Sequence, residues 1–119
     1  MTTDITLGTG DQACAIEAIK RTFARRLRCM DTKQWEIYPT LHTEDVVSET
    51  WDGLPDNDNW TPTASSTNRV VGNEALTRAI RSLLDGGTTV TTVHHGHTPE
   101  IELTSDTTAT GIWAMEDKL

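Results

Sequence analysis

The stretch that decides the fold is residues 88–115, TTVTTVHHGHTPEIELTSDTTATGIWAM. Thr, Val and Ile dominate three segments of it, and these β-branched residues favour strands. The segments are 88–95, 100–103 and 107–115, separated by Thr98-Pro99 and Thr104-Ser105-Asp106. Because Pro, Ser and Asp favour turns, the stretch predicts consecutive strands joined by short connections. Such strands pair antiparallel.

A long amphipathic helix is predicted upstream of this stretch. From Asp11 to about residue 31, apolar residues recur at steps of three and four, which places them on one face of a helix. These residues are Ala13, Ile16, Ile19, Phe23, Leu27 and Met30. Residues 1–10 are rich in Thr and Gly, and we expect them to form a flexible N-terminus.

A short second helix is predicted to follow, with Asp31 as its N-cap. Gln34 comes three residues later, as in a capping box. The residues after this helix predict a strand over 46–51 and then a long polar loop over 52–69.

A third helix is predicted from residue 73 onward, with Asn73 as its candidate cap and Gly86-Gly87 at its end. The order is therefore helix, helix, strand, helix and then bunched strands. This order favours an α+β fold in which helices pack on a mostly antiparallel sheet. The length of 119 residues suits one domain, which we expect to span residues 11–119.

The charge of the chain excludes some functions. Its net charge of −8 argues against nucleic-acid binding, because phosphate contacts need clustered basic residues. One basic cluster does lie on the first predicted helix, and we expect it to be a solvated helix face. It consists of Lys20, Arg21, Arg25, Arg26 and Arg28.

The sequence predicts a cytoplasmic protein without a membrane partner. No apolar run approaches the roughly 20 residues that cross a bilayer. The first residues lack the basic and apolar regions of a signal peptide. Cys14 and Cys29 fall on one predicted helix, where a rise of about 1.5 Å per residue separates them by roughly 22 Å. That is too far for a disulfide, so both are expected to be reduced.

Asp31 is the first candidate for chemistry. It falls four residues after Leu27 and eight after Phe23, which keeps it beside the apolar face at the end of the helix. A carboxylate there is partly desolvated and needs hydrogen-bond donors. Two interpretations remain open from the residues alone, a cap of the second helix and a functional carboxylate.

The His94-His95-Gly96-His97 run is the second candidate. Strand alternation places the His94 side chain on one face of the strand and those of His95 and His97 on the other. Val90 shares the face of His94, and this apolar residue favours that face as the inner one. A buried histidine satisfied by hydrogen bonds and a catalytic acid/base both fit His94. A His-x-His metal site centred on His97 also fits, although no familiar spacing supplies its third ligand.

Other catalytic motifs do not occur in the sequence. It has no Gly-x-Gly-x-x-Gly run or phosphate loop, which makes nucleotide binding improbable. It also lacks the Gly-x-Ser-x-Gly elbow of many serine hydrolases. We therefore expect neither a resident metal nor a cofactor.

Two parts of the chain resemble a known family. The stretch 92–119 and the helix end Arg28-Cys29-Met30-Asp31, with Lys33, Trp35 and Thr40-Leu41 after it, are similar to SnoaL-like proteins. This group belongs to the nuclear transport factor 2-like superfamily, and the chain resembles its bile acid 7α-dehydratase and scytalone dehydratase types. The similarity spans about residues 15–119 and implies a cone-shaped fold.

The resemblance also implies a site. In the family, a histidine on the sheet and an aspartate at the end of the first helix face a cavity. The matching residues are His94, expected to act as a proton shuttle, and Asp31, expected to orient it. Family members place tyrosines where this chain has Arg26 and Glu49, so we expect these two residues to contact the substrate instead. Trp113 and Met115 are expected to line an apolar wall.

The sequence therefore leads to two functional hypotheses. The first is a lyase (dehydratase) or isomerase that removes a proton next to a carbonyl of a hydrophobic hydroxy-ketone, such as a steroid or polyketide. The second is a non-catalytic module that binds a small molecule or serves as the partner subunit of a longer homologue. Because family members continue with two further strands, we expect a homo-oligomer or a heteromer with a related chain to cover the sheet edge.

Overall fold

The computed structural model describes residues 8–50 and 68–118, and the chain forms two compact units. One unit contains residues 1–34 and 90–119, and the other contains residues 35–89. Residues 1–7 of the expected flexible N-terminus and residues 52–67 of the expected loop lie outside the described residues. No helix of the described residues is long and apolar enough to cross a membrane.

Helix α1 (Thr9–Asp31) supplies one side of the first unit. Its buried residues are Leu27, Cys29 and Met30, near its C-terminal end. The helix begins two residues before the predicted start, so Thr9 and Gly10 are helical and not part of a flexible end. Gly8 has extended backbone, and its carbonyl accepts the Gln12 N–H at 2.9 Å to close the first turn.

The end of α1 fixes Asp31 as its last residue. The Gln34 N–H donates to the Cys29 carbonyl at 2.8 Å, and the Lys33 N–H donates to the Met30 carbonyl at 3.3 Å. These two bonds and the left-handed φ of 58° at Lys33 define a Schellman motif. Turns follow, so the prediction that Asp31 caps a second α-helix is wrong. The Gln34 side chain bonds the Thr32 hydroxyl instead of completing a capping box.

Lys33→Gly is expected to stabilise the chain by about 1 kcal/mol, because a left-handed backbone costs a non-glycine residue roughly that much. The change also removes the bond from Lys33 Nζ to the Met30 carbonyl. Chemical denaturation measures the difference in unfolding free energy. Lys33→Ala is the control, since it removes the same bond but keeps the strained backbone. A glycine variant no more stable than the alanine variant would contradict the prediction.

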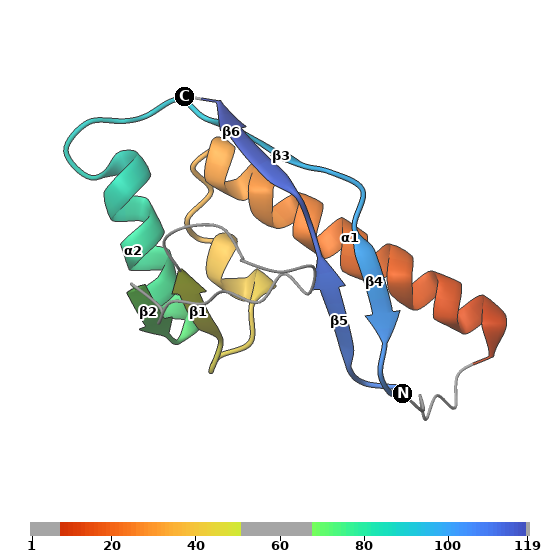
Figure 1. Ribbon diagram of the computed structural model, residues 1–119. Helices are drawn as coiled ribbons and strands as arrows, with labels where there is room; N and C mark the ends of the chain where they lie inside the picture. The colour runs from red at the N-terminus through yellow and green to blue at the C-terminus, as the bar shows by residue number, and fades with distance from the viewer. Residues whose placement is uncertain (1–7, 51–67, 119) are drawn as a thin grey trace, which may run out of the picture. The chain divides into compact units, whose positions relative to one another are not determined.

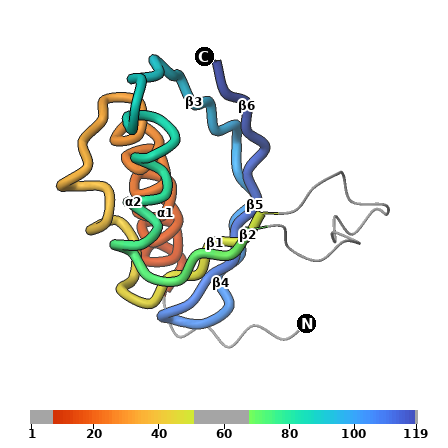
Figure 2. The backbone as a smooth tube through the Cα atoms, turned by 90° about the vertical axis from the view of Figure 1, so that its left-hand side faces the viewer, coloured from red at the N-terminus to blue at the C-terminus, as the bar shows by residue number. Residues whose placement is uncertain are grey.

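Four strands complete the first unit as a long antiparallel ribbon beside α1 (Figures 1 and 2). They are β3 (Val93–Gly96), β4 (Glu100–Leu103), β5 (Ala109–Ile112) and β6 (Met115–Lys118). β3 pairs with β6, and β4 pairs with β5. The His97 N–H donates to the Ala114 carbonyl at 2.8 Å and links the two pairs.

The ribbon corrects two predicted boundaries. Residues 88–92 lie outside any strand, and the predicted strand 107–115 is divided between β5 and β6. Gly96 pairs with Met115, and Glu100 pairs with Ile112. Between these two pairs, one arm has three residues (97–99) and the other has two (113–114). This extra residue makes a bulge, and Pro99, which has no N–H, cannot continue the ladder. Thr98-Pro99 is therefore an interruption within one ribbon arm.

The second unit contains a strand pair and a helix. Its elements are the 3-10 helix Tyr38–Leu41, β1 (Val47–Thr50), β2 (Asn68–Val71) and α2 (Asn73–Asp85). β1 pairs antiparallel with β2, which the sequence did not predict because Asn68 and Arg69 are polar and exposed. Among the described residues, Tyr38, Pro39, Leu76 and Thr77 are buried in this unit. The Trp35 indole N–H donates to Asp85 at 3.2 Å.

Asn73 is the first residue of α2 and not its cap. Gly72 occupies the cap position with a φ of 99°, which glycine adopts readily. The Gly72 carbonyl accepts the Leu76 N–H at 2.9 Å. The Asn73 side chain contributes locally, since its oxygen accepts the Glu74 N–H at 2.9 Å. The two units together give the α+β class that the sequence predicted.

Candidate active site

A cleft of about 760 Å³ lies within the first unit, between α1 and the ribbon. Helix α1 contributes Phe23, Leu27 and Asp31 to its lining, and the ribbon contributes residues 94–99 and Trp113. The strand approaches the helix closely at Gly96. A Cβ there would lie 3.1 Å from the side chains of both Leu27 and Phe23, so glycine permits this approach.

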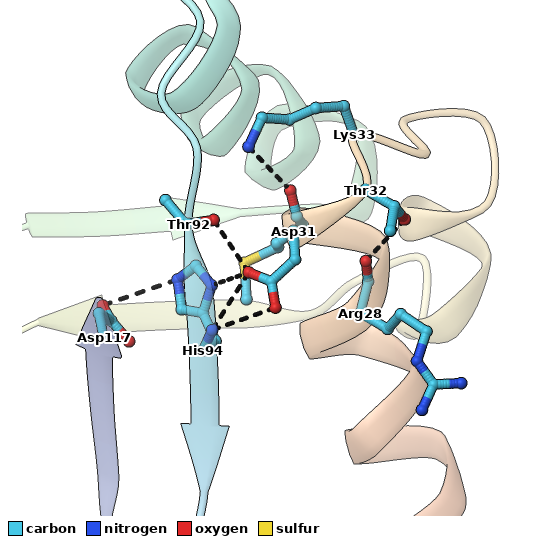
Figure 3. Close-up of polar contacts among 8 residues, drawn as sticks. Arg28, Asp31, Thr32, Lys33, Thr92, His94 and Asp117 are labelled. Atoms are coloured by element: carbon cyan, nitrogen blue, oxygen red, sulfur yellow. Dashed lines mark hydrogen bonds and ion pairs between the residues drawn. The ribbon is translucent and has the colours of Figure 1, made fainter. Parts of the chain in front are cut away.

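Asp31 and His94 meet at this cleft (Figure 3). His94 Nδ1 lies 2.6 Å from Asp31 Oδ1, and the backbone N–H of His94 donates to Oδ2 of the same carboxylate at 3.1 Å. The Thr92 hydroxyl donates to Oδ1 at 2.9 Å. The side chains of His94 and Asp31 are 9% and 20% exposed. Three donors from Thr92 and His94 therefore hold the carboxylate at the end of α1.

The hydrogen bonds set the charge state of Asp31. Burial alone would raise the pKa of this carboxyl group because it removes water from the charged form. The bonds from the His94 ring, the His94 backbone and the Thr92 hydroxyl outweigh burial and lower the pKa below its ordinary value of 3.8. Asp31 is therefore a carboxylate at neutral pH. Because a carboxylate only accepts, Nδ1 carries a proton toward it and Nε2 of neutral His94 is a base.

A second carboxylate faces the other ring nitrogen, and the sequence reasoning missed it. Asp117 Oδ2 lies 3.6 Å from His94 Nε2, and the Asp117 side chain is 51% exposed (Figure 3). The register of β3 with β6 pairs His94 with Asp117. The strand predicted from the sequence ended at residue 115, before Asp117, and the bulge at residues 97–99 also shifts the register by one residue. Both carboxylates stabilise the imidazolium that forms when Nε2 takes a proton.

Trp113 lines the cleft with its aromatic ring, and its contact with a substrate stays a prediction. Its ring stacks on Phe23 with centroids 4.2 Å apart and an interplanar angle of 15°. A Cβ on Gly111 would lie 2.3 Å from the Trp113 ring, so the ring rests against bare strand backbone. Phe23, Trp113 and Gly111 therefore form three successive layers, and Gly111 is the residue that makes room for the middle one.

Gly111→Ala is expected to push the Trp113 ring away from Phe23 and to weaken ligand binding in the cleft by about tenfold. An aromatic contact contributes roughly 0.5–1.5 kcal/mol beyond its buried area, and a ligand that packs on the displaced Trp113 ring would lose a contact of that size. Ligand-induced thermal shifts measure the change in affinity. The control is Gly10→Ala, because a Cβ on Gly10 meets no atom within 4 Å. Equal affinities for both variants would show that Trp113 keeps its place.

The remaining residues predicted to contact substrate lie elsewhere. The Arg26 guanidinium lies 5.9 Å from the centre of the Phe23 ring, on the helix but not in the cleft lining. Met115 is 43% exposed and is also absent from the lining. Glu49 belongs to β1 in the second unit, where it pairs with Arg69 at 3.4 Å.

His95 and His97 approach a different carboxylate from His94, although both also line the cleft. Their side chains are 44% and 57% exposed. Both approach the same Glu116 oxygen, His95 Nδ1 at 3.2 Å and His97 Nε2 at 3.8 Å. In the described part of the chain, no group of three or more His, Cys, Asp or Glu side chains has the geometry of a metal site.

Comparison with protein families now identifies the class of the chain. Residues 11–119 match the family model of the SnoaL-like domain. The match covers nearly the whole chain, which therefore belongs to the SnoaL-like family of the nuclear transport factor 2-like superfamily. This confirms the resemblance to the SnoaL-like family. The family includes polyketide cyclases, isomerases and dehydratases.

Proposed function

We propose that the chain is a lyase or isomerase that removes a proton from carbon next to a carbonyl in a hydrophobic hydroxy-ketone, such as a steroid or polyketide. The observation that carries this proposal is the 2.6 Å contact between Asp31 and His94 Nδ1 at a cleft with aromatic walls. Proton removal of this kind needs a base near neutrality that is held in one tautomer. SnoaL-like domains bind small hydrophobic ligands, which fits such a substrate.

The proposed reaction begins at His94 Nε2. This nitrogen takes the proton from the carbon next to the carbonyl, and the bond electrons form an enolate. Asp31 and Asp117 stabilise the resulting imidazolium, since both are within 4 Å of the ring. In a dehydratase, the enolate then expels a hydroxyl one carbon further on. The imidazolium returns its proton to that hydroxyl, which leaves as water, and the ring is restored as a base.

In an isomerase, the same imidazolium would return its proton to a different carbon of the delocalised enolate. The two outcomes share the first step and differ only in where the proton goes. The substrate's leaving group therefore decides between them, because a ketone without a suitably placed hydroxyl can only isomerise. Turnover assays with both kinds of ketone distinguish the two reactions.

The test is a thermal melt of the chain with a panel of steroid and polyketide hydroxy-ketones, followed by turnover assays with any ligand that binds. A ligand that binds only the folded state stabilises it by about 2.7 kcal/mol at a hundredfold excess over its Kd. We expect one ligand class to raise the melting temperature and to be turned over. If members of the panel bind but none of them is turned over, the enzymatic proposal is contradicted.

A second candidate function is a non-catalytic binding module. The observation in its favour is that the cleft lining within the described residues contains no tyrosine to polarise a carbonyl. Tyr38 is the chain's one tyrosine, and it is buried in the second unit. Binding without turnover, or co-purification with a longer homologue that carries tyrosines, is the outcome that this alternative predicts.

We also propose that the chain forms a homo-oligomer or a heteromer with a related chain. Val93, Ile112 and Met115 on the ribbon are 46%, 61% and 43% exposed, and a second chain would cover such apolar residues. SnoaL-like domains often oligomerise. Light scattering at micromolar concentration tests this proposal, and a monomer would contradict it.

A further inference from the structure

Three arginines of α1 line a groove of about 420 Å³ in the first unit. Arg21, Arg25 and Arg28 are spaced at four and three residues, which places them on one helix face across about 10 Å. Cys29 and Gln34 complete the lining together with Ala24, and no carboxylate contributes to it. The groove is therefore strongly cationic in a chain whose net charge is −8.

The described residues offer these arginines no ion pair. Glu17 lies one helical turn before Arg21, but its carboxylate pairs with Lys20 at 3.2 Å. Asp31 lies one turn after Arg28, but its carboxylate accepts bonds from the ribbon instead. A solvated helix face usually carries alternating charges that pair at such spacings. The groove departs from that pattern, because both nearby carboxylates are engaged elsewhere.

The groove adjoins the candidate active-site cleft along α1. Ala24 and Arg28 line both hollows, so the two meet across α1 at a small side chain. In Figure 3 the Arg28 side chain points away from the Asp31–His94 pair. A molecule with its reacting end at His94 can therefore pass over Ala24 and bring a distant group to the arginines.

We infer that Arg21, Arg25 and Arg28 form a subsite for an anionic group, a carboxylate or a phosphate, at the end of the ligand remote from His94. The planar guanidinium group suits both anions because it donates paired hydrogen bonds to two oxygens. Arg25 and Arg28, one helical turn apart, can hold a single anion between them. This inference rests on the proposed function for the remainder of the ligand, and it narrows the substrate to an acidic hydroxy-ketone.

The experiment compares a dihydroxy-ketone steroid with its mono-hemisuccinate ester, which adds a carboxylate tail to the same rings. The full chain is expected to bind the ester about tenfold more tightly at low ionic strength, with the preference shrinking as salt screens the charges. In a variant with Arg25→Gln and Arg28→Gln, the two ligands are expected to bind equally. A preference for the ester that survives both substitutions would overturn the subsite.

The matched control carries Arg78→Gln and Arg81→Gln on α2, which remove the same two charges from exposed positions in the other unit. This control is expected to keep the preference for the ester. If it loses the preference as fully as the Arg25 and Arg28 variant does, net charge explains the binding and the subsite is overturned. Circular dichroism and melting temperature establish that all variants are folded.

Inorganic pyrophosphate separates this inference from the proposed function. If neither steroid binds, but pyrophosphate binds the full chain and not the Arg25 and Arg28 variant, the anion subsite holds and the steroid proposal fails. If the parent steroid binds as tightly as its ester, the subsite fails, and the proposed function is left to the turnover assays. The absence of binding by pyrophosphate and by the ester alike would also overturn the subsite.

Discussion

Replacing His94 by glutamine is expected to lower turnover by about 10²- to 10⁴-fold, the usual contribution of a positioned acid/base group. The glutamine side chain can donate to Asp31, but it cannot take a proton at neutral pH. Ligand affinity should change little, because the aromatic wall of Phe23 and Trp113 is untouched. The measurement is kcat with the ligand that the thermal melts identify, together with its Kd.

His95→Gln is the matched control for this substitution. It makes the same chemical change one residue along the strand, where the ring faces Glu116 at 3.2 Å and not Asp31. A loss of less than about threefold is expected, since that ring lines the cleft but is not bonded to the Asp31 carboxylate. Comparable losses for both histidines would show that His94 has no special role in proton transfer.

Asp31→Asn is expected to have the second large effect, on both activity and stability. The amide group would donate to Nδ1, forcing the ring proton onto Nε2 and removing the base, so turnover should fall by a similar 10²- to 10⁴-fold.

Bonds to a charged group contribute about 1.5–3 kcal/mol, and the variant should lose about that much unfolding free energy. Asp117→Asn is the control: its carboxylate is half exposed and 3.6 Å from the ring, so we expect a smaller loss of stability.

The stabilising effect of Asp31 should depend on pH in a defined direction. Its pKa is lower in the folded chain than its ordinary value of 3.8, so its ionised form favours folding. The contribution is complete above pH 3.8 and is lost as the pH falls through the lower folded-state pKa. The difference in unfolding free energy between the wild type and Asp31→Asn should therefore shrink below about pH 4. A constant difference down to pH 2 would contradict this.

The fold class could be predicted from the sequence because its signals are local. The apolar spacing from Ala13 to Met30 marks α1, and the β-branched segments mark the ribbon strands. The predicted helix boundaries were wrong where backbone hydrogen bonds decide them. With Gly8 at the cap position, α1 begins earlier than expected, at Thr9. It ends at Asp31, and Lys33 beyond it adopts a strained conformation that favours glycine. β2 was not predicted because its first residues are polar and it forms only by pairing with β1.

The candidate site was predictable only in part. The helical spacing of apolar residues predicted that Asp31 lies beside the apolar face of α1, and strand alternation predicted that His94 points inward. The family resemblance predicted that the two residues act together. Asp117 required the strand register, which depends on a one-residue bulge that no composition reveals. Arg26 and Glu49 were assigned by position relative to family tyrosines, and such positions carry no information about where a longer or charged side chain points.

The most direct test of proton abstraction is hydrogen exchange on the ligand itself. A hydroxy-ketone that binds the chain is incubated in D₂O, and NMR follows deuterium appearing on the carbon next to its carbonyl. The measurement does not depend on whether dehydration or isomerisation follows. The wild type should accelerate exchange well above the buffer rate, and His94→Gln should return it to that rate. A bound ketone whose protons exchange no faster with the wild type than in buffer would contradict the central claim.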